Sequence, residues 1–307
     1  VAERIATEGG EVLLVDRSPV VEDVAAEINA RAESSSGGYG YALALAGVDL
    51  EQEAGARKFV EVALKDYGRI DVLINNAGIG AVGAFDETPL DAHEQVVQTD
   101  LLGYLRGAHA VLPYFKQQQR GVLINTLSVG SWVAQPFAAA YSASKFGLRG
   151  LSQALRGELG PWPGVHICDV YPGIVDTPGF RDGGNYAGRS LQPPPPLIDP
   201  RQVANAMVSL ALHPRHTTSV GATATLLRLA NFLTPGFDRL NGLITGFALG
   251  RAQRVPTSSG NLFHPPLGQR RIDGGWRSAV DGDKHCLLIG GIAAAAVGVC
   301  LCLTRRR

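Results

Sequence analysis

The 307-residue sequence lacks an excess of charge of either sign, because 28 lysine and arginine residues balance 28 aspartate and glutamate residues. No overall field recruits nucleic acid, so we expect no nucleic-acid partner. Cysteine is scarce, and the four cysteines show no disulfide framework, which favours a reducing compartment. They are Cys168, Cys286, Cys300 and Cys302. The seven histidines show no metal-ligand spacing, so no metal site is predicted.

What the chain does contain is an ordinary globular composition, with 45% hydrophobic and 18% charged residues. Short apolar runs alternate with amphipathic stretches along most of its length. The pattern predicts strands at residues 12–15, 41–45, 70–75, 121–126 and 165–170, and helices at 1–8, 20–33, 51–67, 91–115, 138–158 and 199–214. Such alternation is typical of a Rossmann-type doubly wound α/β fold, a parallel sheet that binds ligands beyond the carboxyl ends of its strands.

Two aspartates follow predicted strands at this edge of the sheet. In dinucleotide-binding folds an acidic residue at the position of Asp16 accepts hydrogen bonds from the ribose hydroxyls and repels a 2′-phosphate, which favours NAD. Arg17 could instead pair with a 2′-phosphate, so NADP is the alternative. Asp49 is interpreted as an adenine-pocket residue. Either aspartate could also be no more than the cap of the following helix.

Two further motifs carry possible chemistry. The sequence NNAG, residues 75–78, ends a predicted strand, where its glycine allows close backbone approach and its amides can tie neighbouring strand ends together. The sequence YSASK places Tyr141 and Lys145 four residues apart on one helix face. The ammonium should lower the tyrosine pKa from about 10. On its own such a pair could be a solvated helix face, but Ser128 lies 13 residues before Tyr141 and follows a strand.

Together, NNAG, the serine, YxxxK and YPGIVDTP (residues 171–178) resemble the classical short-chain dehydrogenase/reductase family over roughly residues 1–215. The resemblance implies that Tyr141 is the general acid/base, that Lys145 lowers its pKa and holds the nicotinamide ribose, and that Ser128 hydrogen-bonds the reacting oxygen. It also implies a homo-oligomer. With the two aspartates that follow strands, the cofactor-binding residues that the resemblance implies are Asp16, Asp49, Leu50, Asn75, Ala77, Gly78, Tyr141, Lys145, Pro172, Gly173, Val175 and Thr177.

Two features depart from the family pattern. The glycine-rich turn TGxxxGIG, which holds the pyrophosphate, is absent, so we expect that a first strand and phosphate loop, central to the sheet, have been lost from a longer gene product. In addition, Asp100 replaces an asparagine that helps to hold a water in a proton relay to the lysine. Its negative charge would tend to raise the Tyr141 pKa, although Asp100 could alternatively be ordinary helix surface.

Residues 178–200 are rich in glycine and proline, which is typical of a lid or linker. In the family this stretch covers the substrate, so the candidate substrate contacts are Phe180, Asn185 and Tyr186. Further along, charged residues and a proline interrupt the apolar stretch 226–247. This argues for packed or interface-lying helices rather than a spanning helix.

The end of the chain differs in character. We interpret residues 1–250 as the catalytic domain and 251–285 as a linker. Residues 286–304 form an uncharged run that would span about 28 Å as a helix, close to a bilayer core of about 30 Å. Three arginines follow it. We therefore expect a single C-terminal transmembrane helix that anchors the protein in a lipid bilayer, with the catalytic domain in the cytoplasm. The alternative is a buried core helix.

The sequence therefore predicts a membrane-anchored NAD(P)-dependent oxidoreductase that transfers a hydride to or from a small-molecule alcohol or carbonyl substrate, which we expect to be lipophilic. A competing hypothesis is a catalytically silent relative that uses the fold for binding or as a scaffold. The missing phosphate loop and Asp100 motivate it. A third option, a sugar-nucleotide epimerase, would retain Tyr141 and Lys145, but residues 216–285 are too short for its larger substrate domain.

Overall fold

The computed structural model describes residues 1–34, 38–234, 236–266 and 271–277. Its first half alternates helix and strand: α1 (Ala2–Thr7), β1 (Val12–Val15), α2 (Val20–Ser34), β2 (Ala42–Leu45), α3 (Glu53–Tyr67), β3 (Val72–Asn75), β4 (Ala81–Val82), α4 (Leu90–Val97), the π-helical turn η1 (Gln98–Leu102), α5 (Gly103–Gln118) and β5 (Gly121–Thr126). The second half contains the 3₁₀ turn η2 (Val129–Ser131), α6 (Ala139–Glu158), β6 (Val165–Pro172), α7 (Gly179–Asp182), β7 (Gly184–Asn185), α8 (Pro200–Leu212), β8 (Thr217–Val220), α9 (Ala222–Leu233) and α10 (Phe237–Arg251).

All of these strands pair in parallel, as the alternating pattern predicts, but they fall into three sheets. The largest has the order β3-β5-β6-β8, and β1-β2 and β4-β7 form two-stranded sheets. Among the described residues, β1 and β3 share no ladder. The family resemblance expects a further strand between them.

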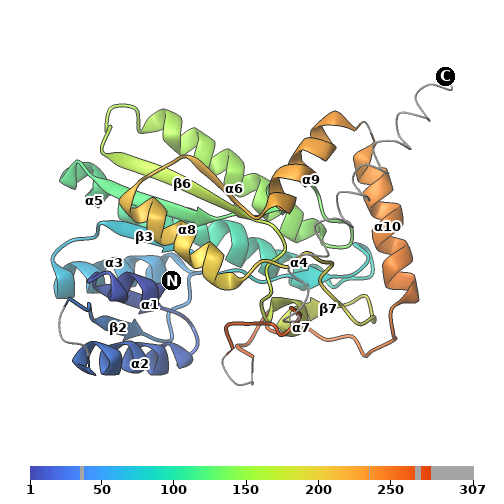
Figure 1. Cartoon of the computed structure of the whole chain (residues 1–307), viewed down its shortest axis with the longest axis horizontal. Helices are drawn as coiled ribbons and strands as arrows, with labels where there is room; N and C mark the ends of the chain where they lie inside the picture. The colour runs from blue at the N-terminus through green and yellow to red at the C-terminus, as the bar shows by residue number, and fades with distance from the viewer. Residues whose placement is uncertain (35–37, 235, 267–270, 278–307) are drawn as a thin grey trace.

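Helices cover both faces of the four-stranded sheet, so the fold has three layers (Figure 1). Successive residues of β5 point to opposite faces, because side chains alternate along a strand. Leu123 packs with α3 and α5, whereas Val122 and Ile124 pack with α8. Helix α8 begins where the Asp199 side chain accepts a hydrogen bond from the Arg201 backbone N–H, with Pro200 in the first turn.

Several elements differ from the sequence prediction. The single helix expected over residues 91–115 is divided by the π-helical turn η1, a feature that has no simple sequence signal and is frequent at functional sites. Residues 178–200 contain α7 and β7, and the strands β4, β7 and β8 were not predicted. These strands are only two to four residues long, so they carry little periodicity.

No helix among the described residues is long and apolar enough to cross a membrane. The predicted transmembrane run, residues 286–304, lies outside the described residues. Helices α9 and α10 stand at the edge of the molecule farthest from β1, β2 and α2 (Figure 1). After α10 the chain returns to the domain, and the side chain of Leu262 is fully buried there. The linker composition of residues 251–285 does not indicate such packing.

Candidate active site

The carboxyl ends of β3 and β5 are joined by side-chain amides. Asn75 donates from Nδ2 to Oδ1 of Asn125 at 3.0 Å and to the carbonyl of Tyr104 at 3.3 Å. One residue further along each strand, the Thr126 hydroxyl donates to Oδ1 of Asn76 at 3.1 Å. The buried Asn75 therefore ties β3 to β5 at the start of the NNAG turn.

Ser128 and Tyr141 come together around Gly130. The hydroxyl of Ser128 accepts a hydrogen bond from the Gly130 backbone N–H at 3.0 Å, which caps η2. A Cβ atom added to Gly130 would lie 3.4 Å from Ser128 Oγ and 3.3 Å from a Tyr141 ring carbon. The same point is 3.0 Å from Nε2 of Gln135, a neighbour of the site that the sequence analysis missed because no motif marks it. Glycine at this position therefore leaves room between the serine and the tyrosine.

Lys145 lies one helical turn after Tyr141 on α6, and it is only 4% exposed. Its ammonium group donates to the carbonyl of Thr126 at 3.2 Å and lies 3.3 Å from Oδ2 of Asp100. It also lies 5.5 Å from the ring centre of Tyr141 and 5.1 Å from that of Tyr104. Burial alone would lower the pKa of Lys145, but the nearby Tyr104, Asp100 and Tyr141 outweigh it and raise that pKa.

Asp100 is completely buried in η1, which excludes the alternative of ordinary helix surface. One carboxylate oxygen accepts the backbone N–H of Ile79 at 2.8 Å, and the other faces Lys145 without a hydrogen-bond partner. Burial raises the pKa of Asp100, opposed by the Lys145 ammonium and by the hydrogen bond from Ile79. A Cβ atom on Gly78 would lie 3.5 Å from Oδ2 of Asp100, so the end of the NNAG turn lies against this carboxylate, and the neighbouring Ala77 is exposed.

The side chains of Asp16 and Asp49 accept hydrogen bonds from backbone groups two residues further along the chain. Asp16 is exposed after β1 and accepts the backbone N–H of Ser18 at 2.8 Å. Asp49 accepts the backbone N–H of Glu51 at 2.9 Å, and the neighbouring Leu50 packs against the main hydrophobic core. Both donors precede the helix that follows, since α2 begins at Val20 and α3 at Glu53, so these are turn contacts and not helix caps. An exposed carboxylate such as that of Asp16 retains free acceptor positions.

The remaining predicted residues follow β6. Gly173 donates its N–H to the carbonyl of Val220 at 3.0 Å, and Val175 bridges to Ile198, so the segment that includes Pro172 and Thr177 continues the sheet edge. Of the candidate substrate contacts, Tyr186 packs in the same cluster as Tyr141. Asn185 instead donates to the carbonyl of Arg189 in a local loop, and Phe180 is half-buried in α7.

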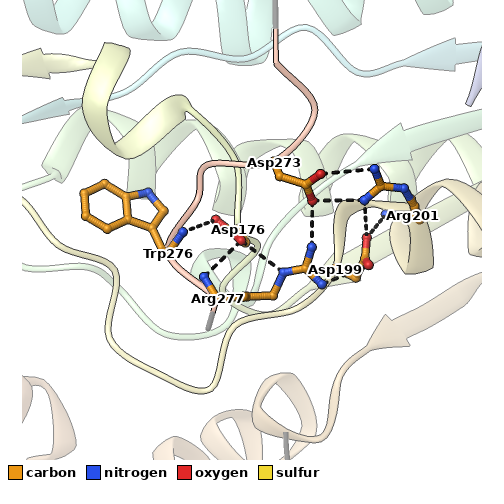
Figure 2. A network of polar contacts seen from close by, with 6 residues as sticks. All are labelled: Asp176, Asp199, Arg201, Asp273, Trp276 and Arg277. Carbon is orange, nitrogen blue, oxygen red and sulfur yellow. Dashed lines mark hydrogen bonds and ion pairs between the residues drawn. The ribbon is translucent and has the colours of Figure 1, made fainter. Parts of the chain in front are cut away.

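A polar network attaches residues 273–277 to the segment that follows β6 (Figure 2). Asp176, in the YPGIVDTP motif, is 1% exposed and accepts the backbone N–H groups of Trp276 and Arg277 at 3.0 and 3.2 Å. The Arg277 guanidinium donates to the same carboxylate at 3.0 Å. Although burial opposes them, these donors hold the pKa of Asp176 below its ordinary value.

Arg277 also joins this carboxylate to two others. Its Nη1 atom lies 2.8 Å from Oδ2 of Asp199, and its Nη2 atom lies 2.6 Å from Oδ1 of Asp273. Arg201 donates two further hydrogen bonds, of 2.9 and 3.0 Å, to the Asp273 carboxylate (Figure 2). The network therefore connects the segment after β6, the start of α8 and residues 273–277.

Residues 252–266, which follow α10, are attached to the domain through Leu262. Its side chain packs against Ala81, Ala92 and Val96, in the cluster that also contains Tyr141 and Tyr186. The guanidinium of Arg17 donates to the backbone carbonyls of Asn261 and Leu262 at 2.6 and 3.3 Å. Arg17, the alternative ligand for a 2′-phosphate, therefore already donates hydrogen bonds to these two carbonyls.

Comparison with known proteins places this geometry in a family. A family model described as short chain dehydrogenase matches residues 1–184. The chain is 38% identical to a 3-ketodihydrosphingosine reductase of Bacteroides thetaiotaomicron over 140 residues, which cover 46% of this chain and 51% of that protein. It is 33% identical to a 3-alpha-(or 20-beta)-hydroxysteroid dehydrogenase of Mycobacterium tuberculosis over 131 residues, 43% of this chain and 50% of that protein.

The chain thus spans about half the length of these two curated relatives. Among solved structures, a metagenomic short-chain oxidoreductase in complex with NADP superposes with a TM-score of 0.57 at 25% identity, covering 71% of this chain and 87% of that one. Since the family model matches more than half of the residues and the serine, tyrosine and lysine converge in space, the chain belongs to the short-chain dehydrogenase family of oxidoreductases.

Proposed function

We propose that the protein is an NAD(P)-dependent oxidoreductase that interconverts an alcohol and a carbonyl compound, with Tyr141 as the acid/base. The observation that carries the proposal is the convergence of Ser128 and the Tyr141 ring on Gly130, with the Lys145 ammonium next to the same ring. These three groups perform the proton transfer and charge stabilisation that accompany hydride transfer.

In carbonyl reduction, the Tyr141 hydroxyl would donate a proton to the substrate oxygen as that oxygen gains negative charge. Ser128 accepts a hydrogen bond from Gly130, which leaves its own proton free to donate to the same oxygen. The buried Lys145 ammonium, whose pKa is raised, supplies a fixed positive charge beside the tyrosine. A bound nicotinamide would supply the hydride.

The residues present fit the nicotinamide half of the cofactor. An ammonium has three N–H donors, and the Thr126 carbonyl accepts one of those of Lys145 while Asp100 lies 3.3 Å away as an ion-pair partner, so a donor remains for a ribose hydroxyl. The pyrophosphate half is different, because the 307 residues contain no TGxxxGIG turn.

We propose NAD as the preferred cofactor. Asp16 at the end of β1 would repel a 2′-phosphate, and Arg17 is held by the carbonyls of Asn261 and Leu262. The NADP-bound solved relative supports the alternative cofactor.

We further propose a lipophilic substrate, such as a long-chain or polycyclic ketone. The similarity to a 3-ketodihydrosphingosine reductase and to a hydroxysteroid dehydrogenase supports this proposal. Residues 286–304 would anchor the protein in a bilayer, the catalytic domain would face the cytoplasm, and the family resemblance supports a homo-oligomer. Extraction of expressed membranes with alkaline carbonate tests the anchor, because an anchored chain remains in the pellet.

The test of function is a fluorescence titration of the detergent-solubilised chain with NADH and NADPH, followed by turnover assays. The panel of carbonyl substrates contains 3-ketodihydrosphingosine, a 20-ketosteroid and the small polar aldehyde glyceraldehyde. We expect tighter binding of NADH and turnover with a lipophilic ketone. Binding without turnover would favour the silent binding module. Turnover of only the polar carbonyl would contradict the proposed substrate class.

A further inference from the structure

Helix α9 presents a row of apolar side chains to the outside. Leu226, Leu229 and Leu233 share one helical face and are exposed, and Phe232 beside them is 84% exposed. Toward the protein, Thr223 is buried and Asn231 donates to the carbonyl of Trp132 at 3.0 Å. Ala224 and Leu227 also pack inward with Val129 and Val133, so α9 is apolar on both sides and its outer apolar face is left exposed.

Helix α10 repeats the pattern. None of its residues is buried, and Leu243, Ile244 and Phe247 are exposed, with Leu243 at 73%. Asn241 holds the helix to the body through a bond to the carbonyl of Ala134 at 3.0 Å. The guanidinium of Arg251 stacks on the Phe247 ring with 4.0 Å to its centre, so a cation lies at the border of the apolar face.

The charge of the two helices favours a lipid surface over a second copy of the chain. Together α9 and α10 contain three arginines and one acidic residue, Asp238. Arg228 stacks on the Trp132 ring at 3.8 Å, whereas Arg239 and Arg251 are exposed. A symmetric dimer would bring the same basic face against itself, which like-charge repulsion disfavours. Anionic lipid headgroups would neutralise these arginines, while leucine and phenylalanine side chains enter the acyl boundary.

We propose that the exposed faces of α9 and α10 lie in the interface of a lipid bilayer that contains anionic lipid. The uncharged residues 286–304 that follow in the sequence fit attachment to the same surface. The inner side of α9 adjoins the segment that follows β6, because a Cβ atom on Gly173 would lie 2.7 Å from the hydroxyl of Thr223 in the first turn of the helix.

The experiment measures hydrogen–deuterium exchange of the full chain without vesicles, with phosphatidylcholine vesicles, and with vesicles that also contain phosphatidylserine. We expect exchange in residues 222–251 to slow by about tenfold or more with the anionic vesicles, and by less with phosphatidylcholine alone. Exchange in residues 103–118 of α5 should not change.

Two variants make the test specific. Combined Phe232→Ser, Leu243→Ser and Phe247→Ser should abolish the slowing in residues 222–251, whereas Leu90→Ser with Leu212→Ser should preserve it. Leu90 and Leu212 are 69% and 65% exposed on other helices, so they control for loss of exposed apolar area.

Two results would overturn the proposal. One is unchanged exchange in residues 222–251 while the chain co-sediments with vesicles, which would assign membrane attachment to other residues. The other is slowing that depends on protein concentration and needs no vesicles, which would assign this face to a second copy. Neither result bears on turnover, so the redox proposal would stand or fall separately.

Discussion

At the scale of single residues, the unusual feature of the site is a buried carboxylate beside the Lys145 ammonium. Asp100→Asn keeps an oxygen that can accept the Ile79 N–H but removes the negative charge. Loss of this charge should make deprotonation of the site easier, so the half-maximal pH of alcohol oxidation should fall by about one unit. A pH profile of kcat/KM measures it. A lower rate with an unmoved profile would limit Asp100 to a structural role.

Asp176 gives a second prediction at this scale, on stability. Its folded-state pKa is lowered, so its contribution is present above the unfolded value of about 3.9 and is lost as pH falls through the folded value. Asp176→Asn should reduce the free energy of unfolding at pH 7 by about 1–3 kcal/mol. It should also flatten the loss of stability below pH 4. Urea titrations at pH 7 and pH 3 measure both, and an equal effect at both pH values would contradict the role of the charge.

At the scale of elements, Leu262 holds the C-terminal segment against α4. Leu262→Ala should cost about 2–4 kcal/mol, because it leaves a cavity beside Ala92 and Val96. Phe263→Ala, at the exposed neighbouring position, is the matched control and should cost less than about 1 kcal/mol. Urea midpoints and proteolysis within residues 252–266 report the effect. Equal losses for the two variants would show that Leu262 does not anchor the segment.

The elements also show what the sequence could predict. The long helices and the strands that end at Asn75 and Thr126 were predictable, because each has clear periodicity and turn signals at its ends. The π-helical turn that buries Asp100 was not, because it depends on the NNAG turn and Lys145, which are distant in sequence. The buried position of Leu262 was equally hidden, since its neighbours come from β4 and α4.

At the scale of the whole molecule, the parallel α/β layers and the meeting of Ser128, Tyr141 and Lys145 follow from motifs that the fold carries to one edge of the sheet. The division between β1 and β3 and the outward apolar faces of α9 and α10 are properties of the assembled chain. Composition alone does not reveal them, because it counts an apolar residue in the same way whether that residue is buried or exposed.

The most direct test of the central claim compares the unchanged chain with Tyr141→Phe, which removes only the phenolic hydroxyl. The measurement is oxidation of NADH driven by 3-ketodihydrosphingosine, followed by absorbance, together with the dissociation constant for NADH. We predict that the variant binds NADH as the unchanged chain does but turns over at least about 10²-fold more slowly. Equal turnover by the variant would contradict the role of Tyr141, and with it the proposed mechanism.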